Sequence, residues 1–303
     1  MAGHTILITG ATGQVGMDLL GHPWPADVTL LAPGRAELDL GSSESIAAYC
    51  ADRQIDCIIN PAAYTAVDLA EDNAGAAFLA NSQGPAWLAD TARERNIPLL
   101  HVSTDYVFDG ALDRPYSEDD PVAPLGVYGA SKLAGELAVR AGAPHHVILR
   151  TTWVISAQRN NFLKTMLRLA AERPELREVA DQCGYPTSAR DIAGTLHTIA
   201  LTHLADAAAP CGTFHFVNAG NATSHGLAEA IISASRVYSG PAVPVAAIGS
   251  GDFPTRARRP ANSRLDTLNS SVISGSTRSH GSKLSSRSSE NFRCPPPQSE
   301  KRA

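Results

Sequence analysis

Residues 5–16 read TILITGATGQVG, and this stretch decides the fold. Its first five residues are apolar or β-branched and predict a buried strand, which meets a glycine-rich turn and then a helix. Gly10 permits the turn, Gly13 leaves room for a pyrophosphate, and Gly16 lets the helix lie close to the strand. Amide groups at the start of that helix would face the phosphates. The spacing is G-x-x-G-x-x-G, which a surface turn could also show, but the strand before it and the helix after it favour a dinucleotide site. The cofactor contacts predicted here are Gly10, Thr12, Gly13, Gln14, Val15 and Gly16.

Strand-like and helix-like segments alternate after this loop. Short apolar strands are predicted at 28–31, 57–60, 99–103 and 146–150, with helices at 43–53, 74–96 and 128–141. This alternation predicts an α/β fold, a Rossmann-like doubly wound parallel sheet with helices on both faces. Ligands bind such sheets outside the carboxyl ends of the strands.

The second half of the chain is less regular. Helices are predicted at 162–172, 189–204 and 223–237, with a strand at 213–217. We therefore expect a dinucleotide-binding domain over 1–155, to which a segment near 187–217 returns, and a smaller interleaved substrate domain over 156–267. Residues 268–303 hold 11 serines and three consecutive prolines. That composition cannot build a core and predicts a disordered tail.

Composition bounds the class of protein. The 303 residues are 44% hydrophobic and carry a formal net charge of −5, which gives no reason to expect a nucleic acid or an anionic membrane as partner. The sequence has no apolar run long enough to span a bilayer, and its start lacks the features of a secretory signal. The five cysteines are odd in number and show no C-x-x-C spacing, so neither a disulfide framework nor a zinc site is predicted, and no metal ligands are assigned. These features predict a cytoplasmic enzyme.

Tyr128 and Lys132 are the candidate catalytic pair, within the run YGASK. Positions i and i+4 share a helix face, so the ammonium is expected to lie near the phenol and lower its pKa from about 10. Such a phenol can give a proton to a carbonyl oxygen as hydride reaches the carbon. Without the glycine-rich loop, a Tyr and a Lys four residues apart would indicate a solvated helix face.

Polar residues follow several predicted strands. No acidic residue directly follows strand 28–31; Arg35 stands there instead, where it could pair with a 2′-phosphate and favour NADPH over NADH, or could be a solvated loop arginine. Asp39 and Leu40 could border the adenine. The segment Ala62-Ala63-Tyr64-Thr65 could line the ribose and nicotinamide. After strand 99–103, the Thr104 hydroxyl could bond a substrate carbonyl and Asp105 could accept from substrate hydroxyls.

These motifs resemble the extended short-chain dehydrogenase/reductase superfamily and, within it, the dTDP-4-dehydrorhamnose reductases. The resemblance runs from Ile6 to about Thr267. It rests on the glycine-rich loop and on six further runs: NPAAYTAVD at 60–68, STDYVF at 103–108, VYGASKLAGE at 127–136, RTTWV at 150–154, NNF at 160–162 and RRPANSRL at 258–265, with DQ-G-PT within 181–187.

The resemblance implies a reaction. NADPH or NADH would give hydride to C4 of a 6-deoxy-4-keto hexose carried on dTDP, yielding dTDP-L-rhamnose. Tyr128 would donate the proton, Lys132 would lower its pKa and hold the nicotinamide ribose, and Thr104 would bond the C4 oxygen. The implied substrate contacts are Asp105, Trp153, Asn161, Asn262 and Arg264.

The tail departs from the resemblance. Some family members hold Mg²⁺ with acidic residues near the C-terminus, at a homodimer contact, but no such residues can be mapped onto 268–303. Two other functions stay open: a related sugar-nucleotide reductase or epimerase, and a non-catalytic NADP-binding subunit of the methionine adenosyltransferase type. Retention of Tyr128, Lys132 and Thr104 together argues against the second.

Overall fold

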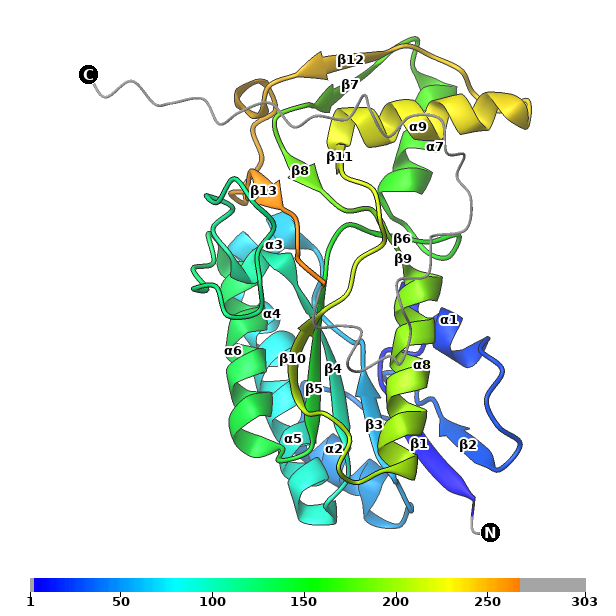
Figure 1. Ribbon diagram of the computed structural model, residues 1–303, viewed down its shortest axis with the longest axis vertical. Helices are drawn as coiled ribbons and strands as arrows, with labels where there is room; N and C mark the ends of the chain where they lie inside the picture. The colour runs from blue at the N-terminus through cyan, green and yellow to red at the C-terminus, as the bar shows by residue number, and fades with distance from the viewer. Residues whose placement is uncertain (1–2, 268–303) are drawn as a thin grey trace.

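A six-stranded parallel sheet forms the centre of the larger part of the molecule (Figure 1), in a computed structural model that describes residues 3–267. In spatial order its strands are β2 (Val28–Leu31), β1 (His4–Ile8), β3 (Cys57–Asn60), β4 (Leu99–Thr104), β5 (His146–Thr151) and β10 (Gly212–His215). Every neighbouring pair is parallel. The predicted doubly wound sheet is confirmed, and its strands begin and end within a few residues of the predicted bounds.

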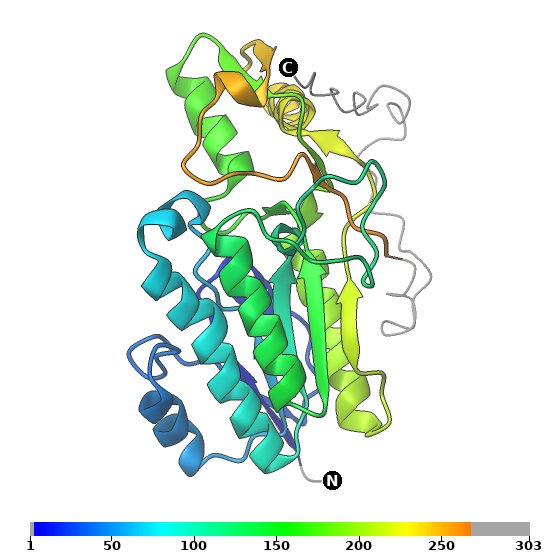
Figure 2. The same ribbon diagram turned by 90° about the vertical axis from the view of Figure 1, so that its left-hand side faces the viewer.

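Helices cover both faces of this sheet (Figures 1 and 2). On one face lie α1 (Gln14–Leu20) and α8 (Ala189–Ala205); on the other lie α2 (Ser43–Ala51), α5 (Gly84–Arg95) and α6 (Val127–Gly142). Each face has its own apolar core, with Leu196 of α8 buried on the first and Leu88 of α5 on the second. Burying one such side chain contributes roughly 1.5–3 kcal/mol. Two packed faces hold the strand ends in fixed positions.

A smaller region lies beyond the carboxyl ends of the strands, at the top of Figure 1. There α7 (Phe162–Glu172) and α9 (Ser224–Val237) pack around Met166 and Ile232, and β7 (Leu176–Val179) pairs in parallel with β12 (Val245–Ile248). Two small sheets, separate from the central one, also form here. In the first, β8 (Cys183–Gly184) lies between β11 (Ala222–Thr223) and β13 (Asn262–Ser263); in the second, β6 (Val154–Ile155) pairs with β9 (Thr187–Ser188). Sequence reasoning predicted none of β6, β7, β8, β9, β11, β12 and β13.

One segment returns from the smaller region to the sheet. Helix α8 packs against α1, and β10 adds to the sheet beside β5, with Phe214 opposite Leu149. The predicted helix at 189–204 and the predicted strand at 213–217 correspond to these two elements. The division into two domains at 155 stays a prediction, and the predicted tail at 268–303 lies outside the described residues.

The helix predicted at 74–96 is interrupted. The structure has α4 (Ala74–Phe78), one π-helical turn (Leu79–Gln83) and then α5. Pro85 lacks the N–H that would bond the carbonyl of Asn81 four residues before it, and its ring crowds that carbonyl, so the backbone widens. The structure also has three short unpredicted helices: α3 (Val67–Asp72) and 3-10 turns at Asp105–Val107 and Ser250–Asp252.

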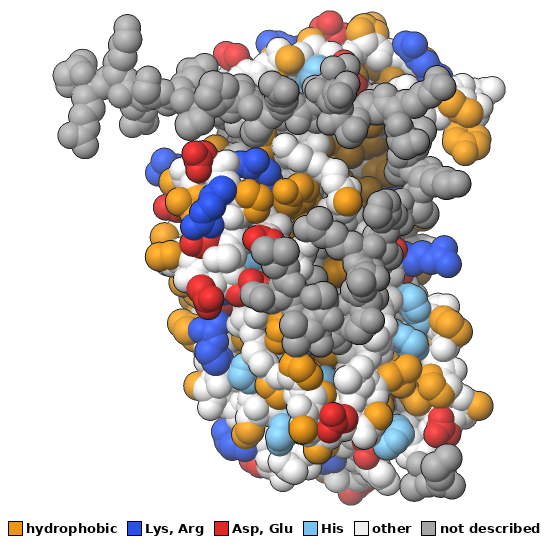
Figure 3. Space-filling view, viewed as in Figure 1, with side chains coloured by type: hydrophobic (Ala, Val, Ile, Leu, Met, Phe, Trp, Pro, Cys, Tyr) orange, Lys and Arg blue, Asp and Glu red, His pale blue; other side chains and the backbone are white. Residues whose placement is uncertain are grey.

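Two observations concern the surface. On the face shown in Figure 3, acidic and basic side chains are interspersed. Within residues 3–267, no helix has both the length and the apolar character needed to cross a membrane.

Candidate active site

The glycine-rich loop connects β1 to α1 in the way the sequence predicted. Gly10 has φ +58°, and a Cβ added to it would lie 2.8 Å from the Ala62 Cα. A Cβ on Gly16 would lie 2.7 Å from the Ala11 Cα, so this glycine permits close packing of helix on strand. At Gly13 an added Cβ would meet only the Gly10 carbonyl oxygen, at 3.2 Å, and would otherwise fill open space. The loop is thus a cradle that side chains would fill, which fits a dinucleotide.

The smaller region contacts this loop directly. Arg159 donates through Nε to the Thr12 carbonyl at 2.7 Å, and Asn161 donates through Nδ2 to Gln14 Oε1 at 3.0 Å. The Asn161 Oδ1 also accepts from the Lys164 amide and so caps α7. Val15 is buried in the core under the loop. Asn161, predicted as a substrate ligand, is therefore placed beside the cofactor loop, where its amide is already bonded.

Arg35 lies beyond the end of β2, as predicted, and its side chain is 87% exposed. Its Nε is 3.5 Å from Asp39 Oδ1, which also accepts from the Gly41 amide at 2.9 Å. An exposed pair of this kind contributes about 0–1 kcal/mol, so a phosphate can compete for the guanidinium. Leu40 follows Asp39; its side chain is partly buried and packs against the apolar core that includes residues of α2 and α5.

The segment Ala62–Thr65 follows β3 and is held by a residue that the motif analysis did not single out. Asn81, fully buried in the π turn, accepts from the Tyr64 amide at 2.7 Å and donates to the Tyr64 carbonyl at 3.1 Å. It also donates to Ser131 Oγ at 3.0 Å, and Ser131 in turn donates to the Tyr128 carbonyl at 2.8 Å. Asn81 therefore fixes this segment to the helix that carries Tyr128. The only sequence signal was a polar side chain before Gly84-Pro85.

Tyr128 lies at the start of α6 with its ring edge-on to that of Tyr106, the centroids 5.4 Å apart. Burial raises the pKa of the Tyr128 phenol well above its usual range, although a hydrogen bond with Thr104 opposes the shift. Thr104 is buried and also donates to Asp105 Oδ1 at 3.0 Å. The structure brings Tyr128, Thr104 and Asp105 together at the carboxyl end of β4, as predicted.

The expected effect of Lys132 on that phenol is wrong for this structure. The Lys132 amine donates to the Val102 carbonyl at 2.8 Å and lies 3.3 Å from His101 Nε2. Because the amine is engaged with β4, burial dominates at Tyr128 and its pKa rises rather than falls. Burial also lowers the pKa of Lys132 to about 8. A protonated phenol is nevertheless the form that a proton donor needs at neutral pH.

Within residues 3–267, four buried side-chain oxygens at one edge of the sheet have no hydrogen-bond partner. They are Ser103 Oγ, Asp105 Oδ2, Thr151 Oγ1 and Thr152 Oγ1, all at or just beyond the carboxyl ends of the adjacent strands β4 and β5. Burial raises the pKa of Asp105 to about 6, against the opposing effect of nearby hydroxyls including Ser263. Buried polar atoms normally have partners, so this group fits a ligand rich in hydroxyls.

Asp105 gives a prediction of pH-dependent stability. Its pKa is about 6 in the folded chain, above the ordinary value of 3.8 expected in the unfolded chain, so the folded state binds more protons between these values. Stability then falls as pH rises through this window and is lowest above pH 6. We expect Asp105→Asn to increase the free energy of unfolding by about 3 kcal/mol at pH 7, an order-of-magnitude figure, and by almost nothing below pH 4. Urea unfolding of both chains at the two pH values measures the difference; an equal gain at both would contradict it.

Trp153 follows β5 in a strained conformation. Its φ of +45° is rare for a bulky residue, and such strain is found where the surrounding structure enforces it, often at functional sites. Its ring lies against Gly184 of β8, where an added Cβ would come 2.5 Å from the Trp153 Cε2. The ring is thereby held between the end of β5 and the smaller region.

Asn262 and Arg264 are engaged with backbone rather than open for a ligand. Asn262 donates to the carbonyls of Leu112 and Arg114, both at 2.7 Å, and its Oδ1 accepts from Arg264 Nε at 2.8 Å. Arg264 also donates to the Asp113 carbonyl. These contacts attach the loop at 112–114 to β13. In this structure Asn262 and Arg264 therefore stabilise that loop, and their predicted contact with the substrate stays a prediction.

A second cluster that the sequence did not predict holds Tyr106, whose ring packs against that of Tyr128. Arg259 donates through Nη1 to the Tyr106 hydroxyl at 3.1 Å and through Nη2 to Asp68 Oδ2 at 2.7 Å. Asp68 Oδ1 accepts from the Ala257 amide at 3.1 Å. These hydrogen bonds fix the position of the Tyr106 side chain. The other members of the cluster are 38 and 153 positions from Tyr106 along the chain, so no local pattern could reveal it.

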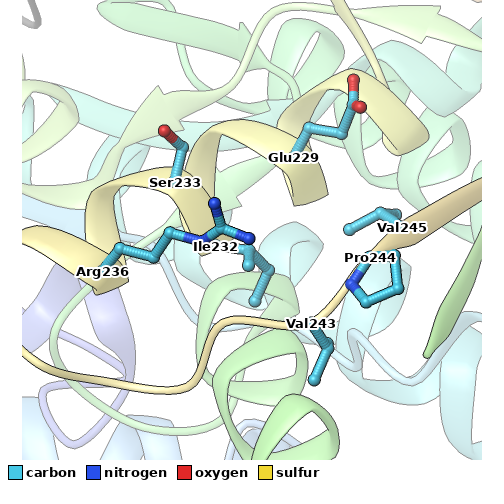
Figure 4. Close-up of a pocket in the computed structure, with 7 residues that line it drawn as sticks. All are labelled: Glu229, Ile232, Ser233, Arg236, Val243, Pro244 and Val245. Atoms are coloured by element: carbon cyan, nitrogen blue, oxygen red, sulfur yellow. The ribbon is translucent and has the colours of Figure 1, made fainter. Parts of the chain in front are cut away.

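A surface hollow of about 260 Å³ lies elsewhere, between α9 and the segment that leads into β12 (Figure 4). Its lining residues are Glu229, Ile232, Ser233, Arg236, Val243, Pro244 and Val245. None of the predicted site residues is among them, so this hollow is separate from the candidate active site. Within residues 3–267, no group of three or more His, Cys, Asp or Glu side chains could hold a metal ion. The Mg²⁺ that the resemblance implies near the C-terminus would lie in 268–303, outside the described residues.

The chain is similar to known proteins over most of its length. The sequence model of the family described as RmlD substrate binding domain matches residues 4–286. A dTDP-4-dehydrorhamnose reductase from Sinorhizobium fredii is 44% identical over 261 residues, which covers 86% of this chain and 88% of that protein. The enzyme of the same name from Escherichia coli is 40% identical over 275 residues, with 86% and 89% covered.

Solved structures of proteins with the same name are similar to this chain in fold. A dTDP-4-dehydrorhamnose reductase from Clostridium acetobutylicum superimposes with a TM-score of 0.80 at 34% identity, covering 87% of this chain and 90% of that one. The Bacillus anthracis enzyme, solved in complex with NADP, gives 0.80 at 32% identity and covers 88% and 92%.

Proposed function

Because the chain belongs to the RmlD substrate binding domain family, we propose that it is an NAD(P)H-dependent dTDP-4-dehydrorhamnose reductase. It reduces the C4 ketone of a dTDP-linked 6-deoxy-4-keto hexose and yields dTDP-L-rhamnose. The observation that carries the proposal is the meeting of Tyr128, Thr104 and the unpartnered hydroxyl and carboxyl oxygens at one sheet edge. The glycine-rich loop lies at the same edge, since the strands are parallel.

The residues of this site divide the reaction between them. Bound NAD(P)H supplies the hydride that reduces C4. The Tyr128 phenol, kept protonated by burial, gives its proton to the C4 oxygen as negative charge develops there. The Thr104 hydroxyl bonds the same oxygen and orients it. Asp105 bonds a sugar hydroxyl, and the ring of Trp153, whose backbone is strained, limits which face of the ketone is presented. Lys132, whose amine lies beside His101 and the Val102 carbonyl, would hold the nicotinamide ribose rather than act on the phenol.

The cofactor site is formed by the glycine-rich loop and the loops after β2 and β3. We propose that Gly13 allows approach of the pyrophosphate, while Asp39, Leu40 and the segment at 62–65 line the rest of the cofactor. Exposed Arg35 favours NADPH over NADH, because a guanidinium can pair with the 2′-phosphate. The NADP complex of the Bacillus anthracis relative supports this preference. The homodimer that the resemblance implies and the cytoplasmic location that the composition predicts stay predictions.

NADPH oxidation by the purified 303-residue chain tests the proposal. The chain is supplied with dTDP-4-keto-6-deoxy-L-mannose or with its GDP-linked analogue. We expect turnover with the dTDP sugar alone. Turnover with the GDP sugar would indicate another nucleotide-sugar reductase, and NADPH binding without turnover on either would favour a non-catalytic subunit.

Lys132→Met gives a prediction for this site. The change removes the charge but keeps most of the apolar stem, so we expect turnover to fall about 100-fold and NADPH affinity about tenfold. Steady-state rates and an equilibrium NADPH titration measure the two effects. A loss of turnover with parental NADPH affinity would refute the cofactor contact. Lys164→Met, which removes an exposed lysine of α7, should change neither value.

A further inference from the structure

A chain of buried polar side chains runs beneath the candidate site. Thr9, Asn60, His101 and Lys132 have exposures of 1%, 0%, 0% and 1%. They come from the residue after β1, from β3, from β4 and from α6, so the chain crosses three adjacent strands and reaches the helix of Tyr128. Burying four polar groups in the centre of a sheet costs free energy that apolar residues would avoid, unless each group is bonded.

Each link of this chain is a hydrogen bond. Thr9 Oγ1 donates to Asn60 Oδ1 at 2.6 Å, and Asn60 Nδ2 lies 3.0 Å from His101 Nδ1. His101 Nε2 lies 3.3 Å from Lys132 Nζ. The other partner of that amine is the Val102 carbonyl, at 2.8 Å. Glu136, one turn along α6, is bonded to Arg150 through both carboxylate oxygens, so it is not the group that holds Lys132.

The chemistry of the links suits a lysine whose charge can change. Imidazole and amide side chains each offer a donor on one side and an acceptor on the other. An uncharged amine accepts from His101 Nε2–H, with Nδ1 accepting from Asn60. A charged ammonium donates to Nε2, with the proton on Nδ1 and the Asn60 amide turned over. In the second arrangement Thr9 Oγ1 accepts from the Asn60 amide instead of donating to it, so each link keeps one donor and one acceptor.

We propose that His101 is a positioning residue for Lys132, which it holds through Nε2 in either charge state. Asn60 and Thr9 tie this contact to the start of the glycine-rich loop, because Thr9 immediately precedes Gly10. The two ends of the cofactor site are thereby linked through the protein interior. This inference rests on the role proposed above for Lys132.

Two substitutions at His101 separate its chemistry from its shape. His101→Phe keeps the ring shape without nitrogens, and His101→Gln keeps a donor and an acceptor without the ring. We expect NADPH affinity and kcat each to fall about tenfold in His101→Phe but to stay within about threefold of the parent in His101→Gln, with the sugar KM unchanged in both. His146→Phe is the control, since His146 lies on the neighbouring strand β5 and its ring contacts the Ala143 carbonyl, away from the buried chain.

The outcomes are distinguishable. Parental values in His101→Phe, or a larger loss in His101→Gln than in His101→Phe, would overturn the proposal in favour of packing alone. If His101→Phe does not fold, Asn60→Leu removes the anchor of the ring and should weaken NADPH binding several-fold; parental affinity there would also overturn it. NADPH affinity is measured without sugar. A parent chain that binds NADPH but reduces no dTDP sugar would therefore refute the proposed function and still decide the role of His101.

Discussion

Tyr128→Phe is expected to lower turnover about 10²- to 10⁴-fold, because it removes the proton donor and leaves the ring in place. The phenol is buried beside Thr104, and its ring packs edge-on against Tyr106, so a phenylalanine fills the same space. Only the hydroxyl is lost. The NADPH dissociation constant should stay within about twofold of the parent, since general acid catalysis acts in the transition state and not in cofactor binding.

Steady-state NADPH oxidation and an equilibrium NADPH titration measure the two quantities. Tyr238→Phe is the control, because Tyr238 is 85% exposed at the end of α9. Its turnover should equal that of the parent. A Tyr128→Phe chain that keeps more than about a tenth of parental turnover would show that another group donates the proton.

Glu136→Leu is expected to lower the free energy of unfolding by about 3–5 kcal/mol. Arg150 donates to Glu136 through Nε at 2.9 Å and through Nη2 at 2.7 Å, and both side chains are at most 2% exposed. Removing the carboxylate leaves a buried guanidinium without its charged partner. The pair fastens α6 to β5, so the loss falls on the helix that carries Tyr128.

Urea unfolding measures this change. The double variant Glu136→Leu with Arg150→Met should recover most of the loss, because apolar residues of similar size can replace a buried pair. Glu172→Ala breaks the exposed Arg168–Glu172 pair of α7 and should cost less than about 1 kcal/mol. A similarly small loss in Glu136→Leu would contradict the account.

The sheet could be predicted from the sequence because its strands are buried on both faces. Ile6, Ile58 and Leu100 lie in short apolar runs that turn residues interrupt, and such runs predict a parallel sheet without knowledge of tertiary contacts. The main helices could be predicted from equally local patterns, namely apolar residues at helical spacing. The two-residue strands β8 and β13 were not, because only tertiary pairing defines them.

The site was only partly predictable. Tyr128, Thr104 and Asp105 meet as expected, because the carboxyl ends of parallel strands share one edge. The pKa of Tyr128 was predicted in the wrong direction, since helix spacing gives the distance between two positions but not where the amine bonds. Asn81 and His101 were missed as site residues because their partners are distant in sequence.

The most direct test of the account follows a labelled hydride. NADPH carrying deuterium at nicotinamide C4, on the face that is transferred, is incubated with the chain and dTDP-4-keto-6-deoxy-L-mannose, and the product is examined by NMR and mass spectrometry. The account predicts dTDP-L-rhamnose with one deuterium at sugar C4. Consumption of the labelled NADPH with deuterium at another carbon, or a product epimeric at C4, would contradict it.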